Sequence, residues 1–258
     1  MTRYSFPVPR GGDAKVIFGL VFTVALAWIY TLADAGMQRM DMGGGEMPMR
    51  LEWTAAYATL VFTMWAVMMV AMMLPGAAPT ILRVARLAHQ RSEGIEGIPA
   101  ALAFTAGYLS IWMGFSFAAT LAQWTLDSAD LLLDTMALRS GVATGALVIG
   151  IGLYQLSPLK RSCLARCSAL SGRVAADQHL SARAIAWLGM RYGMSCLGCC
   201  WVLMLLLFVG GLMNVLWIAA IALLVIAEKN LPWGSRIALL AGAGLIAWGG
   251  VSLTTAAL

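Results

Sequence analysis

Apolar runs long enough to cross a lipid bilayer fill most of this 258-residue sequence. The hydrocarbon core of a bilayer is about 30 Å thick, and a helix needs about 20 apolar residues to cross it. Charged residues make up only 11% of the chain, against about 25% in soluble domains, so they cannot cover a water-facing surface. The sequence therefore predicts an all-α polytopic membrane helix bundle in which residues 1–258 form a single transmembrane domain.

About seven segments meet the requirement for a transmembrane helix. They are residues 16–33, 54–74, 99–124, 141–156, 184–209, 212–227 and 237–258. Gly210-Gly211 separates the fifth from the sixth, because one helix of about 40 residues is too long for a single crossing. Pro75-Gly76 is expected to end or kink the second helix.

Basic residues are distributed unevenly between the connecting segments. With the N-terminus in the cytoplasm, 14 of the 17 Lys and Arg lie on the cytoplasmic side, as the positive-inside rule requires. We therefore expect a multi-pass protein of the bacterial inner membrane, with the N-terminus inside and the C-terminus outside. Residues 34–53 would form an outer loop and residues 157–183 a basic cytoplasmic loop. Topology and anionic lipid explain the positive charge, so the expected partner is the bilayer and not nucleic acid.

Several glycines in the predicted helices would let helix backbones approach closely. They are Gly141 and Gly145 in the fourth segment and Gly242, Gly244, Gly249 and Gly250 in the seventh. Packing inside one bundle is the simpler explanation, and an oligomer interface is the alternative.

Methionine is frequent, with 17 residues, and five of them lie in the predicted first outer loop. These are Met37, Met40, Met42, Met47 and Met49. Glycine and proline in the same loop disfavour a regular helix face, so apolar packing explains these side chains poorly. Thioether sulfur is a soft donor that selects Cu(I). We expect the loop to contact copper; the alternative is a flexible loop whose methionines dip into the membrane interface.

A second methionine pattern follows inside the second predicted helix. Met64, Met68 and Met72 recur at i, i+4 and i+8 and so share one helix face. A ladder of thioethers about 6 Å apart could pass Cu(I) inward. The alternative is that methionine fills the membrane core here.

Three cysteines lie close together in the fifth predicted helix. Cys196, Cys199 and Cys200 stand at i, i+3 and i+4, with Met204 one turn further. On a helix the three sulfurs face one way, near the middle of the bilayer. Two or three thiolates form a strong site for Cu(I), or less favourably for Zn. A single cysteine is commonly a small buried apolar residue, but three within five residues favour a metal site.

Two further cysteines and one acidic residue complete the candidates. Cys163 and Cys167, at i and i+4, follow the fourth segment among basic residues. We expect them at the aqueous inner edge, where they could hand metal over to a carrier. Glu228-Lys229 ends the sixth segment; an interfacial ion pair is the simpler interpretation, and a gating or ligand role for Glu228 is the alternative. The sequence contains no nucleotide-binding or nucleophile motif, so no catalytic residue is expected.

Four motifs in order resemble a known bacterial family, the predicted metal-binding integral membrane proteins. They occupy residues 68–75, 154–167, 196–201 and 213–229, and the resemblance runs from about Trp53 to Lys229. The resemblance implies a membrane copper chaperone that delivers copper to a cuproenzyme. It implies no particular ligands, which are inferred here from residue chemistry.

The leading functional hypothesis is a copper-handling membrane protein and not an enzyme. Cu(I) would pass from the outer methionine loop along the methionine ladder to the cysteines, with a periplasmic or membrane cuproenzyme or a copper carrier as partner. Delivery to an outer enzyme would require the opposite direction, and both remain open. One alternative is a membrane thiol–disulfide oxidoreductase that uses its two groups of cysteines. Another is a structural or assembly subunit of a membrane enzyme complex.

Overall fold

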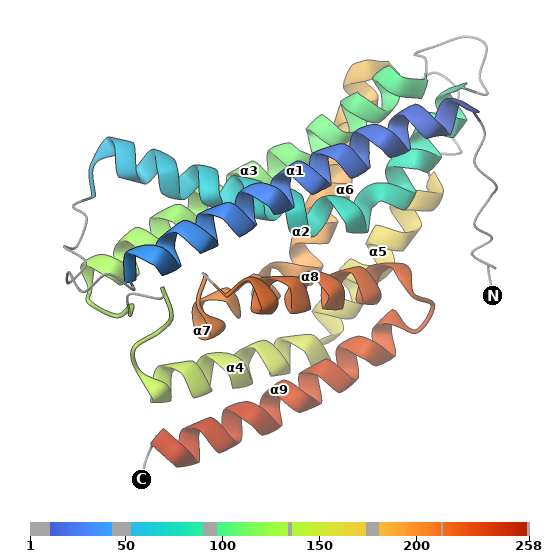
Figure 1. Cartoon of the computed structure of the whole chain (residues 1–258). Coiled ribbons are helices and arrows are strands. Elements are labelled where there is room, and N and C mark those ends of the chain that lie inside the picture. The colour runs from blue at the N-terminus through green and yellow to red at the C-terminus, as the bar shows by residue number, and fades with distance from the viewer. Residues whose placement is uncertain are drawn as a thin grey trace.

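The computed structural model describes residues 11–42, 53–89, 97–133, 136–173, 181–212 and 214–256, without the side chains of 11–12, 35–42 and 168–173. Most of the described residues are helical. The β pairing among them is one isolated antiparallel bridge between Leu132 and Leu138. The helices are α1 (Gly11–Met42), α2 (Ala55–His89), α3 (Gly97–Ser128), α4 (Gly141–Leu156), α5 (Pro158–Arg173), α6 (Ala182–Met204), α7 (Leu207–Gly210), α8 (Val215–Asn230) and α9 (Gly234–Ala256) (Figure 1). The prediction of an all-α fold is confirmed.

Five of the described helical segments are long and apolar enough to cross a membrane. They are Asp13–Asp34 in α1, all of α2, all of α3, Ala182–Gly210 in α6 and α7, and Gly234–Thr255 in α9. Helix α4 and Pro158–Cys167 of α5, bent by 58° at their junction, would together form a sixth. The chain is therefore a multi-pass membrane protein, and five of the segments predicted from the sequence correspond to these helices.

Helix α2 continues through Pro75 and Pro79 to His89, so the expectation that it ends near Pro75-Gly76 is wrong. A proline removes one backbone N–H donor, but a membrane helix can continue past it because neighbouring groups satisfy the carbonyl that loses its hydrogen bond. The second half of α2 is held by burial of one face, which includes Ala77, Ile81 and Val84.

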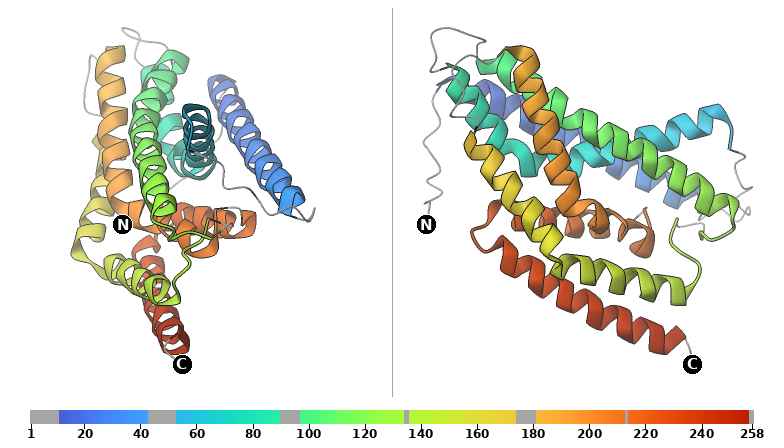
Figure 2. Two further views of the ribbon diagram at one scale, coloured as in Figure 1. Left: turned by 90° about the vertical axis from the view of Figure 1, so that its left-hand side faces the viewer. Right: turned by 180° about the vertical axis from the view of Figure 1, so that it is seen from behind.

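The helices form two groups joined by α5 and α6 (Figures 1 and 2). Helix α1 packs on α2, α2 on α3 and α3 on α6, whereas α4 packs on α9 and α8 contacts both α2 and α9. Helix α5 lies along α6. Helices α1 and α9 lie at opposite edges of the bundle and expose large apolar side chains such as Phe18 and Leu240, as lipid-facing helices do.

Glycines bring α4 and α9 into backbone contact. A Cβ on Gly145 would lie 3.1 Å from the Gly249 carbonyl oxygen, and one on Gly152 would lie 2.8 Å from the Gly242 carbonyl oxygen. Because the lower-numbered residue of α4 meets the higher-numbered residue of α9, the two helices are antiparallel. Gly145, Gly242 and Gly249 thus pack inside one bundle, as expected, whereas Gly244 and Gly250 face open space.

Candidate metal centre

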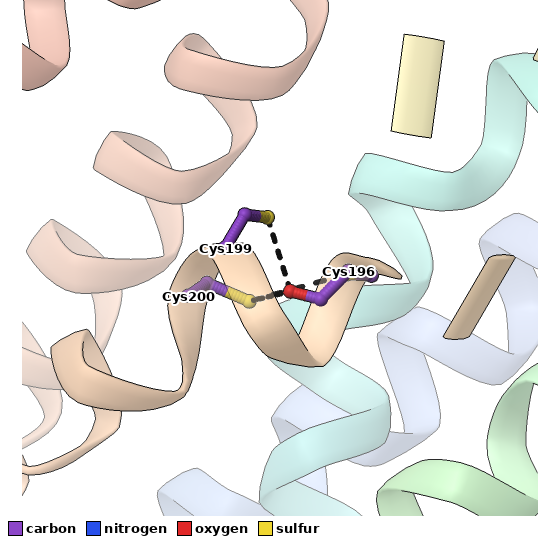
Figure 3. A group of neighbouring side chains, drawn as sticks. All are labelled: Cys196, Cys199 and Cys200. Carbon is purple, nitrogen blue, oxygen red and sulfur yellow. Dashed lines mark hydrogen bonds between the residues drawn. The ribbon is translucent and has the colours of Figure 1, made fainter. Parts of the chain in front are cut away.

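The three cysteines of α6 form a buried cluster of sulfur atoms, called here the cysteine triad. Cys196, Cys199 and Cys200 have Sγ atoms that all lie within 4.8 Å of one another, and each residue is at most 3% exposed. The Cys199 and Cys200 thiols donate to the Cys196 carbonyl oxygen at 3.0 and 2.8 Å (Figure 3). The helical spacing alone explains this convergence, because positions i, i+3 and i+4 share one face.

Close packing of α3 against α6 places a tyrosine on the triad. A Cβ on Gly107 would overlap the Ala186 carbonyl oxygen, and one on Gly189 would overlap the Phe104 carbonyl oxygen, so only glycine permits this approach. As a result the Tyr108 hydroxyl lies 3.4 Å from Cys196 Sγ. The same hydroxyl donates to the Met73 carbonyl oxygen of α2 at 3.1 Å. Tyr108 therefore links α2, α3 and the triad.

A lysine from the last turn of α8 reaches the same sulfur. Lys229 Nζ donates to Cys196 Sγ at 3.0 Å and lies 5.7 Å from the ring centroid of Tyr108 and 5.3 Å from that of Tyr192. The sequence did not predict this contact, because Lys229 was expected to form an interfacial pair with Glu228. Its position at the end of an otherwise apolar helix was the available signal, because a charge near the membrane interior needs a partner.

The other two cysteines face α6 from α5. Cys163 Sγ lies 3.0 Å from the position that a Cβ on Gly198 would occupy, so the absence of a side chain at Gly198 leaves room for this sulfur against α6. Cys167 is 4% exposed and lies beside Tyr192. Cys167 is therefore buried in the helix interface, although the sequence placed it at an aqueous edge. All five cysteines are free.

The methionines of α2 share one apolar core with the triad. Met68 and Met72 are at most 2% exposed and belong to the core cluster that includes the three cysteines, and Met204 of α6 does too. Met64 is partly buried and packs against that cluster. Met68, Met72 and Met204 thus lie in the same hydrophobic core cluster as the triad, and Met64 packs against that cluster.

The outer methionines lie largely beyond what the structure describes. The backbone of α1 is helical as far as Met42, so Met37, Met40 and Met42 are on a helix and not in the loop expected from residue 34. Their side chains, and Met47 and Met49 altogether, lie outside the described residues.

Glu228 takes part in a buried network with Lys160 and Gln155. Its Oε2 lies 2.5 Å from Lys160 Nζ, and its Oε1 accepts from Gln155 Nε2 at 2.9 Å. Lys160 also donates to Gln155 Oε1. Lys160 and Glu228 are 1% and 4% exposed, so the pair joins α5 and α8 in the interior, and Gln155 adds α4 to the network. This burial contradicts two expectations. Glu228-Lys229 was expected at the membrane interface, and Lys160 was expected in a cytoplasmic loop.

The donor set of the triad fits a soft metal ion. Three thiol sulfurs converge in a buried site, and thiolate is the ligand that Cu(I) and Zn(II) prefer. Each ligand loses its proton when a metal binds, and the charge that remains has a lysine ammonium beside it. The residues present can therefore hold a thiophilic cation.

The chain matches the model of a known protein family. A family model, PpoB2, described as a copper chaperone, matches residues 62–252. The matched stretch contains the triad, Lys229 and both cysteines of α5. Neither a curated protein nor a solved structure matches the chain.

Proposed function

The chain belongs to the PpoB2 copper chaperone family, and we propose that it binds Cu(I) at the cysteine triad in order to move or deliver copper at the membrane. The observation that carries this proposal is the convergence of three buried Sγ atoms within 4.8 Å. The role is non-catalytic: the protein holds and releases the metal without changing it.

Copper is favoured over zinc by the number and softness of the donors. A structural zinc site is almost always tetrahedral and closed by four protein ligands, whereas the triad offers three thiols, and Met204, one helical turn beyond Cys200, is a buried thioether. Thiolate and thioether together are the ligand types that select Cu(I). We therefore assign copper as the cargo and zinc as the weaker competitor.

The first test is the metal content of the full-length protein, purified anaerobically in detergent. We expect bound copper in elemental analysis and metal–sulfur scattering alone in its X-ray absorption spectrum. A protein free of metal, with Cys196 and Cys199 joined in a disulfide, would instead support the thiol–disulfide oxidoreductase. A protein with neither metal nor a redox-active disulfide would support a structural or assembly subunit.

The methionines would form the approach to the triad. In this proposal the outer segment with Met37, Met40, Met42, Met47 and Met49 collects Cu(I), and Met64, Met68 and Met72 pass it along α2. Cys163 and Cys167 would then exchange the metal with a carrier. Support comes from the burial of Met68 and Met72 in the same hydrophobic core cluster as the triad and from the contact of Cys163 with Gly198.

Replacement of the five outer methionines by leucine should weaken copper capture. Leucine keeps the apolar character and removes the soft donor, so copper acquisition by cells at limiting copper should fall severalfold while the protein level stays unchanged. Unchanged acquisition would show that the outer segment is a linker only.

We propose seven transmembrane segments, with α8 as the sixth and with the N-terminus in the cytoplasm. Lys160 and Lys229 no longer count toward the charge asymmetry, since both have partners inside the bundle. The remaining basic residues still divide 12 to 3 in favour of the cytoplasmic side. Reporter fusions at Gly44 and Asp130 should therefore read as outside, and fusions at Gln90 and Gly172 as inside. A cytoplasmic signal at Gly44 would reverse the topology.

A further inference from the structure

The ammonium of Lys229 is built into the surroundings of the cysteine triad. Its Nζ lies 3.0 Å from Cys196 Sγ, and the rings of Tyr108 and Tyr192 lie 5.7 and 5.3 Å from it. A cation near the faces of aromatic rings is stabilised by their quadrupoles, more strongly where water is excluded. Gly76 of α2 also packs against this ammonium, because a Cβ on Gly76 would lie 3.5 Å from Lys229 Nζ. Four helices, α2, α3, α6 and α8, thus place one positive charge beside one sulfur.

The separation of two triad sulfurs suits a metal ion bound between them. Cys196 Sγ and Cys200 Sγ are 4.0 Å apart. Metal–sulfur bonds of about 2.3 Å span at most about 4.6 Å between two sulfurs, so an ion could bridge this pair with little movement. Cys196 is the sulfur that Lys229 contacts, and a metal-bound thiolate keeps lone pairs that can accept a hydrogen bond.

The net charge of such a complex depends on the charge of the metal. With Cys199 kept as a neutral thiol that donates to the Cys196 carbonyl oxygen at 3.0 Å, the thiolates of Cys196 and Cys200 and one Cu(I) carry a net charge of −1, which is costly in a membrane interior. The Lys229 ammonium brings the sum to zero. The same two thiolates with Zn(II) are already neutral, so that the lysine would leave a net charge of +1. A fixed cation at this position therefore favours a monovalent over a divalent ion on the same pair of sulfurs.

We propose that Lys229 is a positioning and selectivity residue of the metal centre. It donates a hydrogen bond to Cys196 Sγ and neutralises the two-sulfur complex of a monovalent soft cation. This inference rests on the proposed function, since it presupposes that the triad binds metal. It adds the reason why the site holds Cu(I) in preference to Zn(II).

The test measures the affinities of the full-length protein for Cu(I) and for Zn(II), each against a chromogenic chelator under anaerobic conditions. Lys229→Met removes the charge and keeps an apolar stem. We expect its Cu(I) affinity to fall roughly a hundredfold, as when a buried charge loses its partner, while its Zn(II) affinity stays equal or rises. Lys229→Arg, the matched control that keeps the charge, should hold Cu(I) within about tenfold of wild type.

A second variant leaves the lysine in place. Tyr192→Leu removes one of the two rings beside the ammonium and should weaken Cu(I) binding in the same direction by a smaller factor. It keeps the experiment informative if Lys229→Met fails to fold, which size-exclusion chromatography would reveal. Unchanged Cu(I) affinity in both folded variants, or an equal loss for both metals, would overturn the inference.

These outcomes separate the inference from the proposed function. If the wild-type protein itself takes up no Cu(I), or if it keeps Cu(I) when the triad is removed, the proposed function fails. If the wild type binds Cu(I) through the triad and Lys229→Met binds it equally well, only the role of Lys229 fails.

Discussion

The triple variant Cys196→Ser/Cys199→Ser/Cys200→Ser is expected to purify without copper. Serine has nearly the shape of cysteine but offers a hard hydroxyl in place of a soft sulfur, which Cu(I) binds poorly. All three sulfurs lie within 4.8 Å of one another, so the variant removes the whole cluster at once. Elemental analysis of the anaerobically purified protein should show copper reduced to background, and the short Cu–S signal should disappear.

The control for this result replaces the two cysteines of α5 and leaves the triad unchanged. Cys163→Ser/Cys167→Ser deletes two thiols of α5 that also face α6. We expect this double variant to retain bound copper and to transfer it more slowly to an external carrier. Full copper occupancy in a correctly folded triple variant would show that the triad is packing, and the site would then have to lie among the methionines.

The positions of the helices could be predicted from the sequence because length and hydrophobicity determine membrane spans. The residues at which the helices end could not be predicted in this way. Of the two expectations for α2 at Pro75, an end or a kink, the end is wrong, because the helix continues to His89 with Ala77 and Ile81 buried. Residues 157–183, which include α5, were expected to form a basic cytoplasmic loop. One of these, Lys160, is buried with Glu228, and no local pattern shows such a partner 68 residues away.

The candidate site could likewise be predicted only in part: the convergence of the three cysteines was predictable, and their neighbours from other helices were not. The triad lies within five residues, so helical geometry alone converges its sulfurs. Tyr108 and Lys229 come from other helices, and their contacts with Cys196 depend on how α3 and α8 pack on α6. Gly107 and Gly189 permit that packing, but a glycine in a membrane helix does not identify the helix it will meet. The sequence therefore predicted that the three sulfurs converge, and it did not predict the charge beside them.

The single variant Glu228→Ala is expected to destabilise the bundle strongly. It would leave Lys160, which is 1% exposed, without its carboxylate partner. Removing one member of a buried ion pair costs about 3–5 kcal/mol, because the other charge stays buried and uncompensated. Thermal unfolding in detergent, followed by tryptophan fluorescence, should show a melting temperature lowered by roughly 10 °C.

The double variant Lys160→Met/Glu228→Gln should recover most of this loss, which separates a structural from a functional role of Glu228. With both charges gone, the new amide can pair with Gln155, whose Nε2 now donates to Glu228 Oε1 at 2.9 Å. Replacing a buried pair by uncharged groups is often close to neutral for stability. If the network only joins α4, α5 and α8, the double variant should regain wild-type stability and wild-type copper transfer together. If Glu228 gates the passage of copper, the double variant should regain stability alone, and transfer to a carrier should stay slow. A double variant as unstable as Glu228→Ala would contradict the explanation that the instability comes from one buried charge left without its partner.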